Sequence, residues 1–479
     1  MTARFVRAAA IAAVAAASSA CLVGPTWRKP QTDVPPAFRA PADAGPSLAE
    51  LEWPALFRDP TLQGLIRAAL ARNHDLRMAA ARVEAAAAQA GLARAALRPT
   101  LGYAASAARV DGSDTMAPGT GIPYNDYAAQ ATIAWEADLW GKLRRTSEAA
   151  RESFLATEEA RRAVAISLVA NVAGLYCQLG EFDAELEIAR RTLAGRRENT
   201  RLIKGRFDGG VTSELDFRQA QIQEGDAAAT IAALERSRAL TENALNLLLG
   251  RAPGDVPRGL ALDAQPVPPA IAPGLPSELL ARRPDILAAE HAAHAALAQV
   301  GAAKALRLPS FGLTGALGLE SFELSNFVKS ASRSWSVAGS LAGPIYSFGR
   351  NKRRVEAAQA QAREAALAWE QSVVAAFREV EDALVGVRTA RAEREARVFQ
   401  ADAARVALKL ARARYDGGVS SFLEVLDVER SLFQAELQTV QARSREYQVV
   451  VQLYKALGGG WSGAGAPAPR GESAPTERR

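Results

Sequence analysis

The chain has 479 residues, of which 49% are hydrophobic and only 6% aromatic, and alanine supplies much of the apolar content. Its formal net charge is +6, from 58 basic and 52 acidic residues that are interspersed, so it lacks the basic patch that nucleic-acid binding needs. The sequence contains only two cysteines and three histidines, and it has no phosphate loop or catalytic-triad pattern. These features argue against an enzyme, a metal site or a cofactor site. Alanine-rich sequence with frequent Arg, Glu and Gln favours long, closely packed helices.

Residues 1–20 have the organisation of a secretory signal peptide, with a basic start, an apolar stretch and small residues before Cys21. The apolar stretch is too short to span a bilayer as a mature helix. A cysteine directly after small residues resembles a lipoprotein processing site, which implies lipid attachment to Cys21, although Ser18 stands where such signals usually carry Leu. The alternative is ordinary cleavage that leaves a free cysteine. Residues 21–59 are expected to form an extended, lipid-anchored N-terminal segment.

The strongest pattern in the sequence is an internal repeat. Asp75 recurs as Asp285 at an offset of 210 residues, and the segment from Arg206 recurs as the segment from Arg414 at an offset of 208. A nearly constant offset indicates duplication. The expected segments are a first repeat over residues 60–250, a Pro-rich connector over 251–276, a second repeat over 277–457 and a disordered tail over 458–479.

Each repeat contains the same order of expected elements. A helix comes first, a β-hairpin follows, and two long helices then lead to and from a Gly-Gly turn. The first long helix, which ends near Phe207, would be roughly 95 Å long. A helical hairpin of that length has no compact core of its own, so it must pack laterally against partner helices. The β-hairpins are expected at about residues 100–136 and 310–343, and the helical turns near residues 208–213 and 416–421.

The helix that opens the second repeat carries two of the three histidines. His291 and His294 are three residues apart, so they could share one face of the helix. No cysteine or third histidine stands nearby to complete a metal site. We therefore expect both histidines on the helix surface and no metal ligands there.

The expected β-hairpins show a strand-like alternation. Leu313 and Leu317 alternate with Gly312, Thr314 and Ala316, and the other three segments follow the same pattern. Each segment is long enough to cross a membrane as a tilted strand, and a face of small and polar residues suits a wet lumen. A soluble hairpin with one buried face would show the same alternation. Four strands do not close a barrel, however, and open edges cannot sit in lipid, so three chains with twelve strands are expected.

The Gly-Gly turns at the helical tips have a plain structural reason, because glycine at a helix end takes left-handed backbone angles at little cost. The next helix then begins with a capping-box pattern, Ser213 with Asp216 in the first repeat and Ser421 with Glu424 in the second. Asp427 lies three residues beyond Glu424 on the same helix face, and capping does not explain it.

Several segments in combination resemble the TolC superfamily of outer-membrane efflux proteins, in the lipoprotein branch called NodT or OprM type. The matching segments are Cys21–Pro25, Trp53–Asn73, Trp135–Lys142, Arg282–Glu290 and Pro344–Arg350, together with both Gly-Gly turns. The resemblance implies a mainly α chain with membrane β-strands, which forms a homotrimer. In that trimer a twelve-stranded outer-membrane β-barrel, four strands per chain, is continuous with a long periplasmic α-helical barrel.

The resemblance also assigns roles to the tips. By that match Asp216, Tyr415, Glu424 and Asp427 form a periplasmic gate, in which Glu424 and Asp427 ring the lumen. The family's best-known gate uses an arginine where this chain has Ser420, so a gate locked by that ion pair is not expected. The residues expected to dock the adaptor at the two tips are Arg206, Gly209, Gly210, Val211, Arg414, Gly417, Gly418 and Val419.

The expected function is a passive exit duct of a tripartite efflux system in the outer membrane, anchored by lipid and extending into the periplasm. Its expected partners are two further copies of the chain, outer-membrane lipid, a periplasmic adaptor and an inner-membrane transporter of the resistance-nodulation-division type. The expected cargo is small molecules, with type I protein secretion and metal efflux as alternatives. A periplasmic coiled-coil scaffold would explain the helices but not the strands or the lipoprotein-like start.

Overall fold

The computed structural model of the chain describes residues 22–30, 35, 37–39, 51–111, 123–266 and 276–459. The expected signal peptide, Cys21 and nearly all of the expected tail lie outside these residues. The chain divides into two compact units, each built from three stretches of sequence. The first comprises Met1–Gln31, Ala81–Glu158 and Ala288–Glu370, and the second Thr32–Ala80, Glu159–Leu287 and Gln371–Arg479. Each unit takes sequence from both repeats, so the repeats are not separate bodies.

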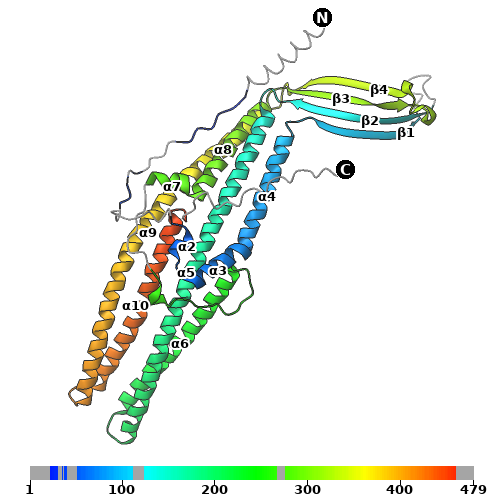
Figure 1. Cartoon of the computed structure of the whole chain (residues 1–479). Helices are drawn as coiled ribbons and strands as arrows, with labels where there is room; N and C mark the ends of the chain where they lie inside the picture. Colours follow the sequence, from blue (N-terminus) through cyan, green and yellow to red (C-terminus); the bar gives the residue numbers. More distant parts are fainter. Residues whose placement is uncertain are drawn as a thin grey trace. The chain divides into compact units, whose positions relative to one another are not determined.

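The two repeats contain matching elements, which Figure 1 labels along the chain. The first has α2 (Trp53–Leu56), α3 (Pro60–Arg72), α4 (His74–Ala95), β1 (Thr100–Val110), β2 (Tyr124–Ala137), α5 (Lys142–Asp208) and α6 (Glu214–Leu248). The connector contains one turn of 3-10 helix, η2 (Leu262–Ala264). The second has α7 (Pro276–Arg282), α8 (Pro284–Ala305), β3 (Ser310–Ser321), the short turns η3 (Leu324–Asn326) and η4 (Ser330–Ser332), β4 (Arg333–Ala342), α9 (Arg350–Asp416) and α10 (Phe422–Ala456). Helices α5 and α9 both have 67 residues, and α6 and α10 both have 35, so duplication has kept the hairpin length.

The four strands form one antiparallel sheet in the order β1-β2-β3-β4 (Figure 1). Because β2 pairs with β3, the hairpin of the first repeat continues directly into that of the second. One row across the sheet contains Tyr103, Ala131, Leu317 and Trp335, which face one side. The next row faces the other side and consists of Gly102, Thr132, Ala316 and Ser336. The register therefore keeps large apolar side chains on one face and small or polar ones on the opposite face.

The core of the second unit gathers side chains from α3, α5, α6 and α10. Phe57 is fully buried and contacts the rings of Tyr447 and Tyr454, at 6.4 and 6.0 Å between ring centroids.

Among the described helices, α5 alone has a stretch apolar enough to cross a membrane, and half of that stretch is buried. Leu168 and Leu179 of α5 belong to the core, which accounts for apolar residues there.

A buried carboxylate fixes the connector to this core. Asp59 caps α3 by accepting a hydrogen bond from the backbone N–H of Thr61 at 2.8 Å. Its other oxygen accepts from the Tyr176 hydroxyl at 2.8 Å, the Leu260 N–H at 2.9 Å and the Gln265 amide at 2.8 Å. Burial alone would raise the pKa of Asp59, but these hydrogen bonds outweigh it and hold the pKa below its ordinary value.

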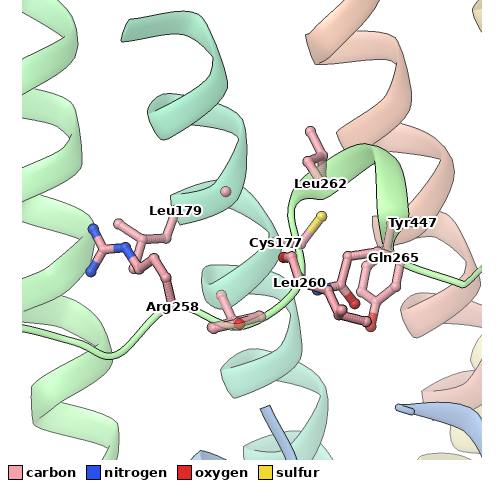
Figure 2. A pocket seen from close by; sticks show the side chains of 9 residues that line it. Cys177, Leu179, Arg258, Leu260, Leu262, Gln265 and Tyr447 are labelled. Carbon is pink, nitrogen blue, oxygen red and sulfur yellow. Dashed lines mark hydrogen bonds between the residues drawn. The ribbon is translucent and has the colours of Figure 1, made fainter. Parts of the chain in front are cut away.

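The connector passes over a free cysteine beside this network. In Figure 2, Leu260 and Gln265 of the connector lie near Cys177 of α5 and Tyr447 of α10, around a cavity of about 30 Å³. That volume holds about one water molecule. Burial raises the pKa of Cys177 to about 12, and its thiol lies 3.6 Å from the Ser444 hydroxyl. A thiol in that state is a packing group rather than a nucleophile.

The two repeats end their helical hairpins in the same way. The Asn73 amide, at the start of α4, donates to the carbonyl of Leu248, the last residue of α6, at 3.0 Å. In the second repeat Arg283, directly before α8, donates to the carbonyl of Ala456, the last residue of α10, also at 3.0 Å. Each side chain satisfies a carbonyl that a helix end leaves unpaired, and so holds the returning helix in place.

Candidate functional site

The apolar face of the sheet is exposed to solvent in the single chain. Tyr103 is 92% exposed and Val337 75%, and Leu101, Leu317 and Trp335 are exposed as well. An apolar face of this size is unfavourable in water but suits the hydrocarbon of a membrane. Strands β1 and β4 each have one edge that is unpaired in the sheet, and such edges cannot remain open in lipid. The sheet therefore has the features of a barrel segment that other copies must complete.

Both helical tips turn with the same hydrogen bonds. In the first tip, Val211 N–H donates to the Arg206 carbonyl at 2.8 Å and Gly210 N–H to the Phe207 carbonyl at 2.9 Å. The second tip repeats both bonds at 2.9 and 3.0 Å. Gly210 and Gly418 have φ of 74° and 71°, the left-handed region where glycine is favoured. The expectation from the sequence that glycine in these turns takes left-handed backbone angles is therefore confirmed.

Each tip also exposes two apolar side chains. Val211 and Leu215 are exposed on the first tip, and Val419 and Leu423 on the second. The two valines are among the residues expected from the sequence to dock the adaptor, whereas the two leucines were not predicted. The 208-residue offset, which relates Leu215 to Leu423, is the signal that could have found them.

The first tip forms the expected capping box. Ser213 Oγ accepts from the Asp216 N–H at 3.2 Å, and the Asp216 carboxylate accepts from the Ser213 N–H at 3.4 Å. The hydroxyls of Thr212 and Ser213 donate to the same carboxylate, each at 2.8 Å. Partial burial would raise the pKa of Asp216, but these hydrogen bonds lower it below its ordinary value. These bonds, all to Oδ2, keep Asp216 within its own hairpin.

The second tip differs, and the expected capping box at Ser421 is wrong. The Ser421 side chain makes no capping hydrogen bond. Glu424 is one methylene longer than its counterpart Asp216, and it reaches back to Arg414 with 3.1 Å between the carboxylate and Nε. Ser420 Oγ is buried without a hydrogen-bond partner among the described residues.

The arginines at the two tips consequently have different partners. Arg206 and Arg414 occupy the same position in the two repeats. Because Asp216 is already engaged, Arg206 extends to the other hairpin, where Nη1 donates to the Tyr415 hydroxyl at 2.9 Å. Its guanidinium carbon lies 5.5 Å from the centre of the Tyr415 ring, within the range of a cation–π contact. This contact joins α5 to α9 directly at the tips.

An apolar cluster packs the same four helices together near the tips. It contains Ile203, Ala220, Ala411, Phe422, Val425 and Leu426. Asp427 pairs with Arg430 on its own helix at 2.6 Å. Of the residues assigned to the gate, Tyr415 contacts the other hairpin through Arg206, while the partners of Asp216, Glu424 and Asp427 among the described residues lie within their own hairpins.

The histidine pair of α8 is half-buried rather than on an open helix surface. His291 Nδ1 lies 2.7 Å from a Glu152 oxygen, and His294 Nε2 lies 3.0 Å from a Glu148 oxygen. The Trp27 ring stacks on His294 at 5.2 Å between centroids. The described part of the chain contains no group of three side chains able to hold a metal ion.

The comparisons with known proteins agree with this geometry. The family model for outer membrane efflux proteins matches residues 65–251 and 275–459. The chain belongs to the outer membrane efflux protein family. It is 36% identical over 461 residues to the outer membrane protein OprJ of Pseudomonas aeruginosa, covering 94% of this chain and 95% of OprJ. It is 34% identical over 457 residues to the cation efflux system protein CusC of Escherichia coli, covering 94% and 97%. The crystal structure of the open state of the Neisseria gonorrhoeae MtrE outer membrane channel superposes with a TM-score of 0.83 at 35% identity, covering 92% of this chain and 98% of MtrE.

The predicted fold class is confirmed: the chain is mostly helical with four strands in one sheet, and the solved structures that share its fold include outer-membrane channels. As a member of this family, the chain is an outer-membrane channel of an efflux system and extends into the periplasm, as expected. It works with an adaptor and an inner-membrane pump, and its family is one of transport channels rather than enzymes.

Proposed function

We propose that this family member is a passive, gated exit duct for small molecules, with no catalytic step of its own. Three chains place their four-stranded sheets edge to edge, and the open edges of β1 and β4 become the joints of a twelve-stranded barrel. The apolar face of the sheet contacts lipid, and the face that contains Thr132 and Ser336 lines the lumen.

The gate lies at the helical tips and is held by the contact between Arg206 and Tyr415. This contact supports the proposal most directly, because it ties the two hairpins of one chain together where the family's arginine is replaced by Ser420. The carboxylates of Glu424 and Asp427 are exposed and face the lumen as acidic rings. Such rings raise cation occupancy in a narrow pore. Asp216 supports the gate indirectly, because its engagement in the capping box leaves Arg206 available.

The tips also dock the adaptor. The exposed pairs Val211 with Leu215 and Val419 with Leu423 offer apolar contacts on the Gly-Gly turns, and Arg206 and the other tip residues named from the sequence flank them. The inner-membrane partner is a resistance-nodulation-division pump that expels small molecules. Metal efflux is the second candidate, because CusC bears the name of a cation efflux protein.

Cys21 is the lipid anchor of the mature chain. Mass spectrometry of the mature N-terminal peptide should find a diacylated, N-acylated cysteine as the first residue, and Cys21→Ala should leave an unprocessed precursor. A mature peptide that begins elsewhere, or an unmodified thiol at Cys21, would remove the anchor from the proposal.

Single-channel recording of the purified trimer in a planar bilayer tests the duct and its gate. The unmodified channel should show a small conductance that prefers cations. Tyr415→Phe removes the hydroxyl that Arg206 binds, so it should raise the conductance several-fold without changing the ion preference. The double variant Glu424→Ala, Asp427→Ala should weaken the cation preference, because it removes the acidic rings. It should also raise the conductance, because it breaks the ion pair between Arg414 and Glu424 at the second tip.

The control is Glu214→Ala, which removes an exposed acid from the first tip that pairs with Arg218 on its own helix. It should leave both conductance and ion preference unchanged. If the folded trimer conducts nothing even with the tip substitutions, the duct mechanism is wrong. If it conducts but Tyr415→Phe behaves like the unmodified channel, the gate assignment alone is wrong.

A further inference from the structure

A histidine of α8 lies between two carboxylates of α5. His294 Nε2 is 3.0 Å from an oxygen of Glu148, and its Nδ1 is 3.3 Å from an oxygen of Glu152. A neutral imidazole carries a proton on only one of its two ring nitrogens, so it directs a lone pair at one of these carboxylates. The imidazolium directs an N–H at both. The geometry of the site therefore fits the charged form of His294.

The neighbouring histidine does not need a second proton. His291 Nδ1 lies 2.7 Å from the same oxygen of Glu152, and a neutral imidazole with its proton on Nδ1 satisfies that contact. The Glu152 side chain is only 6% exposed, so its charge depends on donors within the protein. The proton shared between the two carboxylates by His294 is thus the one whose loss changes the site.

Two arginines of α5 also face these carboxylates. Arg145 lies 2.8 Å from the second oxygen of Glu148 and leaves the first oxygen to His294. Arg151 lies 3.8 Å from Glu152, but its side chain is 73% exposed, and so long an ion pair with an exposed partner contributes little. Neither arginine replaces the imidazolium between the two carboxylates.

The N-terminal segment, residues 22–29, passes over this site. The Trp27 ring stacks on the His294 ring, with 5.2 Å between their centroids and 15° between their planes. An aromatic face attracts a cation, so Trp27 contacts the imidazolium more favourably than the neutral ring. Without the second N–H, the His294 ring is also held less firmly in the orientation on which Trp27 stacks. Loss of the proton therefore weakens the hold on this part of the segment.

The other contacts of the segment do not involve histidine. Lys29 pairs with Glu290 of α8 at 2.7 Å, and its ammonium lies 6.0 Å from the centre of the uncharged Trp369 ring of α9. The Lys29 side chain is exposed, so this pair contributes little on its own. At the start of the segment, the Val23 N–H donates to the Trp140 carbonyl at 3.2 Å. A backbone hydrogen bond does not titrate, so the start of the segment is held at any pH.

We propose that His294 is a proton-sensitive clamp for the N-terminal segment. In its charged form it bridges Glu148 and Glu152 and holds Trp27 against α8. Histidine is the side chain whose charge changes between about pH 5 and 8, so the clamp opens as the pH rises through this range. Opening frees residues 27–29, while the start of the segment stays in place. The clamp uses none of the tip residues, so it is independent of the gate proposal.

Electron paramagnetic resonance of a nitroxide on Arg28→Cys tests the clamp in the purified full-length protein. Cys177 is buried, and unmodified protein treated with the same reagent gives the background signal. The ratio of mobile to immobile label should rise roughly threefold to tenfold from pH 5.5 to pH 8.5. His294→Gln should leave the label mobile at both pH values. The control is His74→Gln, at an exposed site on α4, which should respond to pH as the unmodified protein does.

A second variant separates the proton from the structural role of the ring. Glu148→Gln supplies an amide that can donate to the unprotonated Nε2 of His294, so the label should stay immobile even at pH 8.5. The proposal is wrong if the mobility of the label on Arg28→Cys does not change with pH, or if His294→Gln retains the change.

Crystal structures of the unmodified protein at pH 5.5 and pH 8.5 give a measurement that does not depend on how the variants fold. Trp27 should stack on His294 at the lower pH and be displaced or lack density at the higher pH. The Val23 hydrogen bond to Trp140 should be present at both. An unchanged stack of Trp27 on His294 at pH 8.5 would contradict the clamp.

Discussion

Two buried carboxylates in this protein have pKa values shifted in opposite directions, according to the hydrogen bonds that each accepts. Asp59 accepts four hydrogen bonds at 2.9 Å or less, so its pKa stays below the ordinary value and its contribution to stability is lost only in acid. Glu185 of α5 is also buried but accepts a single strong hydrogen bond, from Gln441 at 2.7 Å. Burial, assisted by the charge of Glu181, raises the pKa of Glu185 to about 7 against that hydrogen bond.

The raised pKa of Glu185 predicts that the folded chain loses stability as the pH rises from about 4.5 to about 7, because the folded state holds the proton more tightly than the unfolded state. Glu185→Gln removes this titration. The variant should be more stable than the unmodified protein at pH 8, by about 1–3 kcal/mol, and nearly equal to it at pH 4.5. Denaturant unfolding at both pH values measures the difference. Glu395→Gln, at an exposed site on α9, should show no such pH dependence, and an equal effect of Glu185→Gln at both pH values would contradict the argument.

At the scale of elements, the ends of the helical hairpins depend on glycines with left-handed backbone angles. Gly250 follows α6 with φ of 67°, and a Cβ there would lie 2.5 Å from the carbonyl oxygen of Arg72. Gly250→Ala should therefore destabilise the fold by about 1–3 kcal/mol. Gly205→Ala, in the last turn of α5 where a Cβ meets no atom within 4 Å, should instead stabilise it by about 0.5–1 kcal/mol. Thermal unfolding compares the two, and a Gly250→Ala variant as stable as Gly205→Ala would refute the role of the backbone angle.

The elements were predictable from sequence where a local rule decides their form. The Gly-Gly pairs predicted both tips because the left-handed angle belongs to one residue, Gly210 or Gly418. Alternation predicted the two faces of the sheet because side chains point to opposite faces with a period of two. No feature of the local sequence predicted that β2 pairs with β3.

The partners of the tip arginines could not be predicted in this way. Arg206 and Arg414 share one repeat position, yet one reaches Tyr415 and the other Glu424. The difference depends on one methylene, Asp216 against Glu424, and on which acceptor the capping box has already engaged.

At the scale of the whole molecule, the two faces of the sheet should tolerate charge differently. Val337 lies on the apolar face and Ser336, its neighbour in β4, on the opposite face. Val337→Lys should reduce the amount of folded trimer in the outer membrane, because a lysine in the hydrocarbon costs about 2–4 kcal/mol in each chain. Ser336→Lys should assemble normally, because the proposed barrel places its side chain in the water-filled lumen. Heat-modifiable gel mobility measures the folded trimer, and equal loss in both variants would show that the faces are assigned wrongly.

The pairing of Tyr127 with Ser321 between β2 and β3 has a consequence for how the protein is made. During export the first hairpin emerges well before its partner strand, with the whole of α5, α6 and the connector between them. Until β3 arrives, β2 offers an unprotected edge to any other extended chain nearby. Contacts between such distant parts of a sequence form slowly and leave intermediates open to aggregation. We therefore expect a chaperone to protect the first hairpin during this interval, and the four-stranded sheet is completed only after the second hairpin has been delivered.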